Sequence, residues 1–156
     1  MVNLNGEDNF KQAKVASSST IYLCMLTALM NVILIISFRE VIVGIYTTDE
    51  IIFSLAVHLL IFAAIFQLPD GIQMGALGSL RGFKDTFVPM ILLFISYWIF
   101  AMPIGYYLTM TGFDAPMGAA GMWFGMIIGL SVFAILAILR LRWIVKKYLK
   151  KIEVIY

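Results

Sequence analysis

The sequence predicts an all-α integral membrane protein with four transmembrane helices. Of its 156 residues, 62% are hydrophobic and 13% are charged, and the mean hydropathy is +0.98. A soluble domain has about 25% charged residues, and a soluble chain of this length could not bury so much apolar surface. Four apolar runs are each long enough to cross a bilayer, which takes about 17–25 residues. The positions of lysine and arginine along the chain agree with four crossings.

The predicted spans cover residues about 17–38, 51–80, 87–110 and 118–139. The polar links between them are short and cover residues 39–50, 81–86 and 111–117. We expect no cleaved signal peptide, because the first run follows mostly polar residues and ends without a small-residue cleavage site. The single cysteine, Cys24, excludes an internal disulfide.

The segment after the fourth span, residues 140–156, is a basic tail with apolar residues and lysines at helical spacing. We interpret it as an amphipathic helix that continues from the span. Trp143 and the lysines would hold it at the lipid headgroups as a stop-transfer anchor. A specific lipid or partner site is the alternative. Membrane lipids are therefore expected partners.

The lysines and arginines predict the orientation in the membrane. With four crossings, only Arg39 falls on one side. Cationic side chains are retained on the cytoplasmic side, so we expect a multi-pass protein of the inner (plasma) membrane with both termini in the cytoplasm. Three or five spans would break this pattern. The ten residues on the other side are Lys11, Lys14, Arg81, Lys84, Arg140, Arg142, Lys146, Lys147, Lys150 and Lys151.

Glycines recur at helical spacing in the second and fourth spans. In the fourth, Gly121, Gly125 and Gly129 are four residues apart. Such rows let helix backbones approach closely, and close packing drives helix association in lipid. We therefore expect these three glycines to lie in a helix–helix contact, which could also be a moving interface.

One carboxylate carries most of the functional information. Asp70 is the only formally charged residue within the predicted spans, and an Asp at a bilayer centre costs roughly 2.5–3.5 kcal/mol on insertion scales. The only histidine, His58, is about 18 Å away along the helix axis and cannot pair with it. Asp70 could be a protonated group that hydrogen-bonds a neighbouring helix. It could also carry a proton or a cation, since such groups often mark ion pathways.

The residue before this carboxylate is a proline. Pro69 has no N–H, so the carbonyl of Ile65 loses its helical donor and the helix is expected to bend. Free carbonyls beside a carboxylate are typical of the broken helices that bind cations in coupled transporters. The sequence has no phosphate-binding loop, no metal-ligand spacing and no nucleophile elbow. We expect no enzyme activity, no nucleic-acid partner and no cofactor, with Na⁺ or H⁺ as the coupling ion and no metal other than a Na⁺ at Asp70.

Three segments together resemble a known transporter family. They are LIFAAIFQLPDGIQMGALGSLRGFKDTFVPM (60–90), SYWIFAMPIGYYL (96–108) and GAAGMWFGMIIGL (118–130). The ordered set, with Q-x-x-D-x-x-Q, a loop close to G-x-L-R-G-x-x-D-T, then Y-W, P-x-G-Y and a Gly-rich last helix, resembles the C-terminal part of the multidrug and toxic compound extrusion (MATE) family, NorM-like branch. The resemblance covers nearly the whole chain.

The resemblance implies a twelve-helix antiporter of two six-helix lobes that exports bulky, often cationic, drug-like compounds in exchange for Na⁺ or H⁺. This chain would supply the last four helices, so the whole of residues 1–156 is expected to be a partial C-terminal lobe, a truncated or split product whose partner is the missing N-terminal lobe. Asp70 matches the family's cation-site carboxylate. Phe66, Pro69 and Gln73 are implied as cavity-lining or hinge residues, and Phe66 stands where some members have Tyr.

Two other classes of function stay open. One is a self-standing four-helix exporter that acts as a dimer, although such small pumps have their carboxylate in the first span, which here has none. The other is a non-transporting membrane assembly subunit, in which Asp70 would join helices by a hydrogen bond.

Overall fold

The computed structural model describes residues 3–112 and 115–153, with the side chains of residues 15–112 and 115–148. These residues form helices and short connections without any strand. The elements are α1 (Asn3–Tyr46), α2 (Glu50–Gly82), α3 (Phe87–Ile95), a π-helix η1 (Ser96–Ala101), α4 (Met102–Met110) and α5 (Ala119–Glu153).

Four stretches of the described residues are long and apolar enough to cross a membrane, and the third combines α3, η1 and α4. The predicted all-α membrane fold with four transmembrane helices is therefore confirmed. The stretches are Val15–Tyr46, Glu50–Gly82, Phe87–Met110 and Ala119–Tyr148.

The first membrane helix is longer than its apolar run. α1 continues without a break through Arg39 and Glu40. Both residue types favour helix, and their long side chains can extend the charge toward the interface, so charge alone does not end the helix. The break falls at residues 47–49, where Asp49 caps α2. Its Oδ1 accepts hydrogen bonds from two backbone N–H groups of the first turn, at 2.9 and 3.1 Å.

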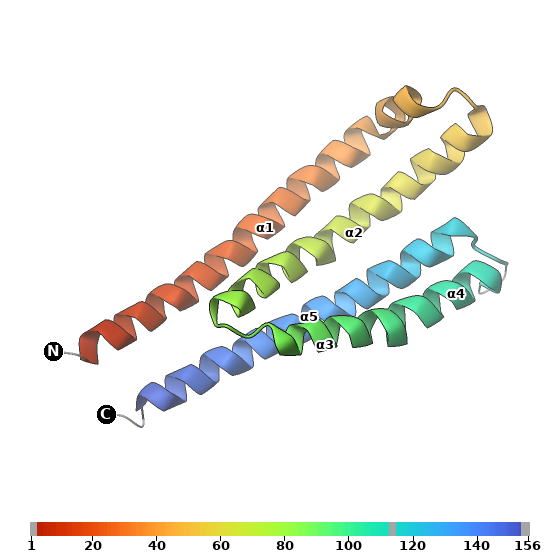
Figure 1. The fold of residues 1–156 in the computed structure, drawn as a ribbon. Helices are drawn as coiled ribbons and strands as arrows, with labels where there is room; N and C mark the ends of the chain where they lie inside the picture. The colour runs from red at the N-terminus through yellow and green to blue at the C-terminus, as the bar shows by residue number, and fades with distance from the viewer. Residues whose placement is uncertain (1–2, 113–114, 154–156) are drawn as a thin grey trace.

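The helices form an up-and-down arrangement in which α2 and α5 are central. α1 packs on α2, α2 on α5, and α5 on η1 and α4. Figure 1 shows that the start of α1, the α2–α3 turn and the end of α5 lie at one end of the bundle. The α1–α2 and α4–α5 connections lie at the other end (Figure 1). The chain therefore makes an even number of passes, which places its basic segments at a common end.

Glycines bring α2 close to α1. A Cβ added to Gly71 would lie 2.7 Å from the Cβ of Ala28, and one added to Gly75 would lie 2.7 Å from the Cα of Ile21. Carbon atoms are never this close without a shift of the backbone, so the two helices can pack at this separation only because both positions lack a side chain. Packing of this kind stabilises helix pairs in lipid.

A second row of glycines brings α5 close to η1 and α4. A Cβ on Gly121 would lie 2.5 Å from a backbone nitrogen of α4. A Cβ on Gly125 would overlap Gly105 and lie 2.6 Å from the carbonyl oxygen of Ala101, and one on Gly129 would overlap the side chain of Ala101. All three glycines of the row thus face the third membrane helix at backbone distance.

The π-helix η1 is a feature that the sequence analysis did not predict. Its wide turn is visible in the bond from the N–H of Met102 to the carbonyl of Tyr97, five residues earlier. Pro103 follows two residues after η1, and within a regular α-helix its ring would clash with the carbonyl of Ile99. One widened turn relieves such a clash, and π turns are often found at functional sites. It also changes the direction in which the side chains of this helix point.

The best-packed apolar cluster joins α2 to α5 near the end of the bundle that holds the α2–α3 turn. Phe133 and Leu80 are fully buried in it. Large apolar side chains elsewhere, above all along α1, are exposed on the outer surface. In a membrane-embedded helix bundle such a surface contacts lipid. The cluster consists of Ala76, Leu80, Phe133, Ala137, Leu141 and Ile144.

Candidate functional site

Asp70 lies well inside a membrane helix and shares a face with two other singled-out residues. Phe66, Asp70 and Gln73 follow each other at spacings of four and three on α2, which places them on one side of a helix. Phe66 packs edge-to-face on Trp123 of α5, with ring centroids 5.9 Å apart. This face of α2 is therefore turned toward α5. Asp70 itself is half-buried.

A tyrosine from a third helix lies within electrostatic range of Asp70. Tyr97 of η1 is half-buried. Within the described residues no hydrogen bond joins the two groups, and the carboxylate has no cationic partner there. A charge this deep in a membrane needs compensation, so the site can accept a proton or a small cation.

Gln73 adds an unsatisfied oxygen. The residue is only 9% exposed, and its Oε1 is buried without a hydrogen-bond partner among the described residues. Buried amide oxygens are normally bonded, and leaving one unpaired costs about 1–3 kcal/mol. The oxygens of Gln73, Asp70 and Tyr97 are all hard ligands. Carboxylate and carbonyl oxygens of this kind suit hard cations such as Na⁺.

Pro69 is half-buried within α2, and the helix continues past it in both directions. The carbonyl of Ile65 has no N–H to accept from at position 69, because proline has none. The structure thus keeps the helix whole where a broken helix was one expected geometry. The expected bend at Pro69 stays a prediction.

Two of the singled-out features fall outside this site. His58 is exposed, and it lines a separate pocket with Phe62 and Met117. The described residues contain no group of three His, Cys, Asp or Glu side chains that could hold a metal ion. A cation at Asp70 would therefore need oxygen ligands other than a second carboxylate among the described residues.

Sequence reasoning missed Trp123 as the partner of Phe66 and Tyr97 as a residue within electrostatic range of Asp70. Both are aromatic residues in apolar runs, where aromatic residues are common. Which side of the third membrane helix Tyr97 takes depends on the widened turn of η1. The signal in the sequence was the pair of hydroxyl groups of Ser96 and Tyr97 in a mostly apolar segment.

The fold defines a class of protein. Four helical stretches that are long and apolar enough to span a membrane, one of them with a carboxylate and a proline in its interior, are those of a multi-pass membrane protein.

Comparison with known proteins identifies the family: the MatE family model matches residues 1–107, and the chain belongs to this family. The predicted resemblance is therefore confirmed.

Curated relatives support the same assignment. The multidrug resistance protein NorM of Photobacterium profundum is 44% identical over 140 residues, which cover 89% of this chain and 31% of the relative. NorM of Vibrio cholerae is 42% identical over 144 residues, covering 91% and 32%. The multidrug resistance protein MdtK of Yersinia pseudotuberculosis is 39% identical over 143 residues, covering 91% and 31%. The chain thus spans about a third of the length of these relatives.

Proposed function

We propose that this chain is the C-terminal part of a cation-coupled multidrug efflux antiporter of the inner membrane, with Asp70 as the coupling carboxylate. The observation that carries the proposal is the position of Asp70 inside α2, on the face where Phe66 meets Trp123 and without a cationic partner among the described residues. The names of the relatives, multidrug resistance proteins, support export of drug-like compounds. The missing partner would be the N-terminal lobe, and Na⁺ or H⁺ would be the coupling ion.

An apolar pocket along the part of α2 that precedes Asp70 supports a substrate of this kind. Its volume is about 470 Å³, and residues of α1 and α2 line it together with Trp123. Pockets of about 300–1,000 Å³ with mostly apolar walls are typical of sites for small organic molecules. Trp123 also packs on Phe66, one turn before Asp70. The indole therefore connects the apolar wall to the face that would hold the ion.

Coupling follows from competition between the two ligands. A proton or Na⁺ neutralises Asp70 and changes its electrostatic interaction with Tyr97. A cationic drug gains most from the charged carboxylate, so it is favoured when the ion has left. For transport, the ion must bind one conformation of the protein more tightly than the other, because equal affinity shifts no equilibrium. Pro69 and the widened turn of η1 are the positions in the two helices best able to absorb such a change.

The test uses a chimera in which this chain replaces the matching third of the NorM relative. Membrane vesicles that contain the chimera are loaded with drug. An ion gradient is then imposed across the vesicle membrane, and drug efflux is measured. We expect Asp70→Asn to abolish gradient-driven efflux while membrane insertion stays intact, because an uncharged residue inserts more easily. Asp70→Glu should retain part of the activity.

The matched control is Glu40→Gln, which makes the same chemical change at an exposed position near the end of α1. It should pump like the parent. Equal efflux by Asp70→Asn and the parent at equal expression would show that Asp70 is only structural. Efflux by the 156-residue chain expressed alone would favour the self-standing dimeric exporter. Stable assembly with another membrane protein but no efflux from the chimera would favour the assembly subunit.

A further inference from the structure

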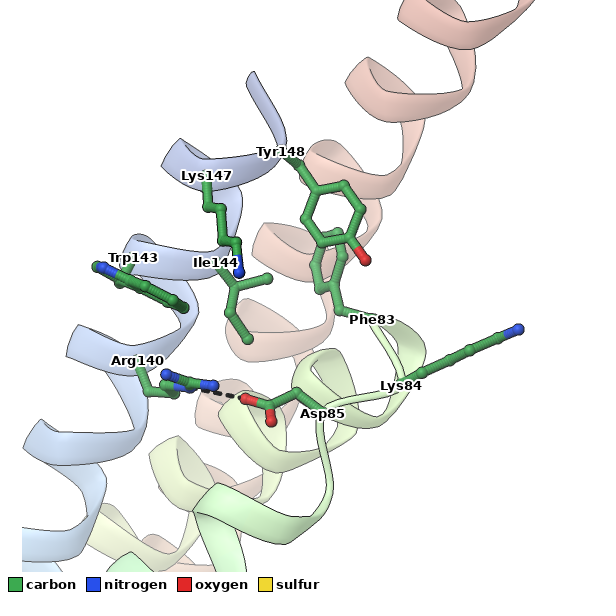
Figure 2. A pocket seen from close by; sticks show the side chains of 8 residues that line it. All are labelled: Phe83, Lys84, Asp85, Arg140, Trp143, Ile144, Lys147 and Tyr148. Atoms are coloured by element: carbon green, nitrogen blue, oxygen red, sulfur yellow. Dashed lines mark hydrogen bonds and ion pairs between the residues drawn. The ribbon is translucent and has the colours of Figure 1, made fainter. Parts of the chain in front are cut away.

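A second charged cluster lies at the end of the bundle, far from Asp70. Arg140 of α5 donates a hydrogen bond from Nε to Oδ2 of Asp85 in the α2–α3 turn, at 2.8 Å. The two residues are part of the lining of a pocket of about 290 Å³ between α5 and this turn (Figure 2). The pocket has no role in the proposed transport mechanism.

The pocket has an excess of positive charge. Lys84, Arg140 and Lys147 line it with a single carboxylate, Asp85. Figure 2 shows that Lys84 points away, whereas Arg140 and Lys147 point inward. Arg140 uses only its Nε for Asp85, and Lys147 has no ion-pair partner among the described residues. Free N–H donors on both side chains are therefore aimed at one space.

The aromatic walls fit the membrane interface. Trp143 and Tyr148 line the pocket and are 51% and 45% exposed. Residues 118–139, about 22 in number, rise about 33 Å, which is enough to cross the hydrocarbon core of about 30 Å. If the apolar residues 118–139 fill the hydrocarbon core, the turn of α5 that follows lies at headgroup level, where Trp and Tyr are enriched.

Two cationic side chains of the protein already make cation–π contacts with the ring of Trp143. The guanidinium carbon of Arg140 lies 4.6 Å from the ring centroid, and Nζ of Lys147 lies 5.1 Å from it. A choline group would therefore have to share this ring with two positive charges, which repel it. The lining favours an anionic headgroup and disfavours phosphatidylcholine.

We propose that this pocket binds the phosphate of an anionic phospholipid headgroup through Lys147 and the terminal nitrogens of Arg140. The volume admits a headgroup, and the exposed aromatic rings border the acyl chains. Basic pockets between membrane helices on the cytoplasmic side bind such headgroups, and Arg–phosphate hydrogen bonds are among the stronger ones in proteins. Asp85 holds Arg140 in position and so acts as a positioning residue.

The test measures lipid binding to the purified 156-residue chain by native mass spectrometry, with phosphatidylglycerol and phosphatidylcholine as probes. We expect phosphatidylglycerol to bind more tightly. Lys147→Gln should weaken its binding about fivefold, the factor for losing one cation at an anionic surface. Lys147→Arg should bind like the parent, which distinguishes lost charge from a damaged fold.

The matched control is Lys146→Gln, which removes the same charge one residue away, at an exposed position that does not line the pocket. It should change phosphatidylglycerol binding less than twofold. Equal losses in the two variants would reduce the effect to general attraction by the basic tail and overturn the proposal. Equal affinity of the parent for the two lipids would overturn it as well. Displacement of phosphatidylglycerol by inorganic phosphate at matched concentration would assign the pocket to a soluble anion instead.

Discussion

At the scale of single residues, the candidate site was predicted mainly from one feature, the charged side chain of Asp70 within an apolar span. Asp70 was singled out because its insertion cost requires an offset, and the structure places it on the same face of α2 as Phe66 and Gln73. The role of Gln73 was predicted only through the family resemblance, since a Gln in a membrane helix is ordinary. Tyr97 could not be predicted, because its direction depends on a turn that hydropathy does not register.

The oxygen of Tyr97 can be tested by removing the hydroxyl alone. In the chimera, Tyr97→Phe should raise the ion concentration for half-maximal efflux several-fold, because one hydrogen bond or ligand oxygen contributes about 0.5–1.5 kcal/mol. The maximal rate at saturating ion should change little. The ion concentration for half-maximal efflux is obtained by measuring efflux over a series of Na⁺ concentrations, and over a series of pH values at fixed Na⁺.

Tyr106→Phe is the matched control, because Tyr106 lies in α4 of the same membrane helix but is 67% exposed. It should leave the ion dependence unchanged. Identical ion dependence of the two variants and the parent would remove Tyr97 from the site.

At the scale of elements, hydropathy and length were sufficient to predict four membrane helices. They were not sufficient to set helix ends or interruptions. α1 passes through Arg39 and Glu40 because nothing in those residues stops a helix. η1 ends two residues before Pro103, yet Pro69 is accommodated inside a continuous α2. The same residue type thus has two outcomes, and the surrounding packing, not the local sequence, decides between them.

The glycine row of α5 gives a prediction at this scale. Gly125→Leu should lower the yield of folded, monodisperse protein, because its side chain would have to displace the backbone of Gly105 and Ala101. Overpacking of this kind costs typically 1–3 kcal/mol, and more where backbone must move. Thermal unfolding of purified protein in detergent, followed by circular dichroism, measures the loss.

Gly82→Leu is the matched control, since a Cβ at Gly82 meets nothing within 4 Å. It should be tolerated, as should Leu136→Ala. Similar unfolding temperatures for Gly125→Leu and Gly82→Leu would mean that α5 does not pack on α4 as the structure has it.

At the scale of the whole molecule, the distribution of charge and the path of the chain agree. The α2–α3 turn and the α5 tail share one end of the bundle in Figure 1, and both are basic. The sequence predicted that the basic segments lie at one end of the bundle. Each span reverses the direction of the chain, so successive links lie at alternate ends, and the basic links alternate with the neutral ones. The structure does not include a membrane, so the side that faces the cytoplasm stays a prediction from the positive-inside rule.

Cysteine labelling tests that side with substitutions that leave every charge in place. In a Cys24→Ser background, single cysteines are introduced by Thr48→Cys, Thr111→Cys and Gly82→Cys, all at exposed positions in or next to the connections. None of them changes a lysine or arginine, so the charge pattern under test is kept.

A membrane-impermeant maleimide added to intact cells should label Thr48→Cys and Thr111→Cys. Gly82→Cys should react only after permeabilisation, because the α2–α3 turn is retained in the cytoplasm with Arg81 and Lys84. Labelling of Gly82→Cys in intact cells would reverse the orientation and would also place the proposed headgroup pocket on the outer leaflet.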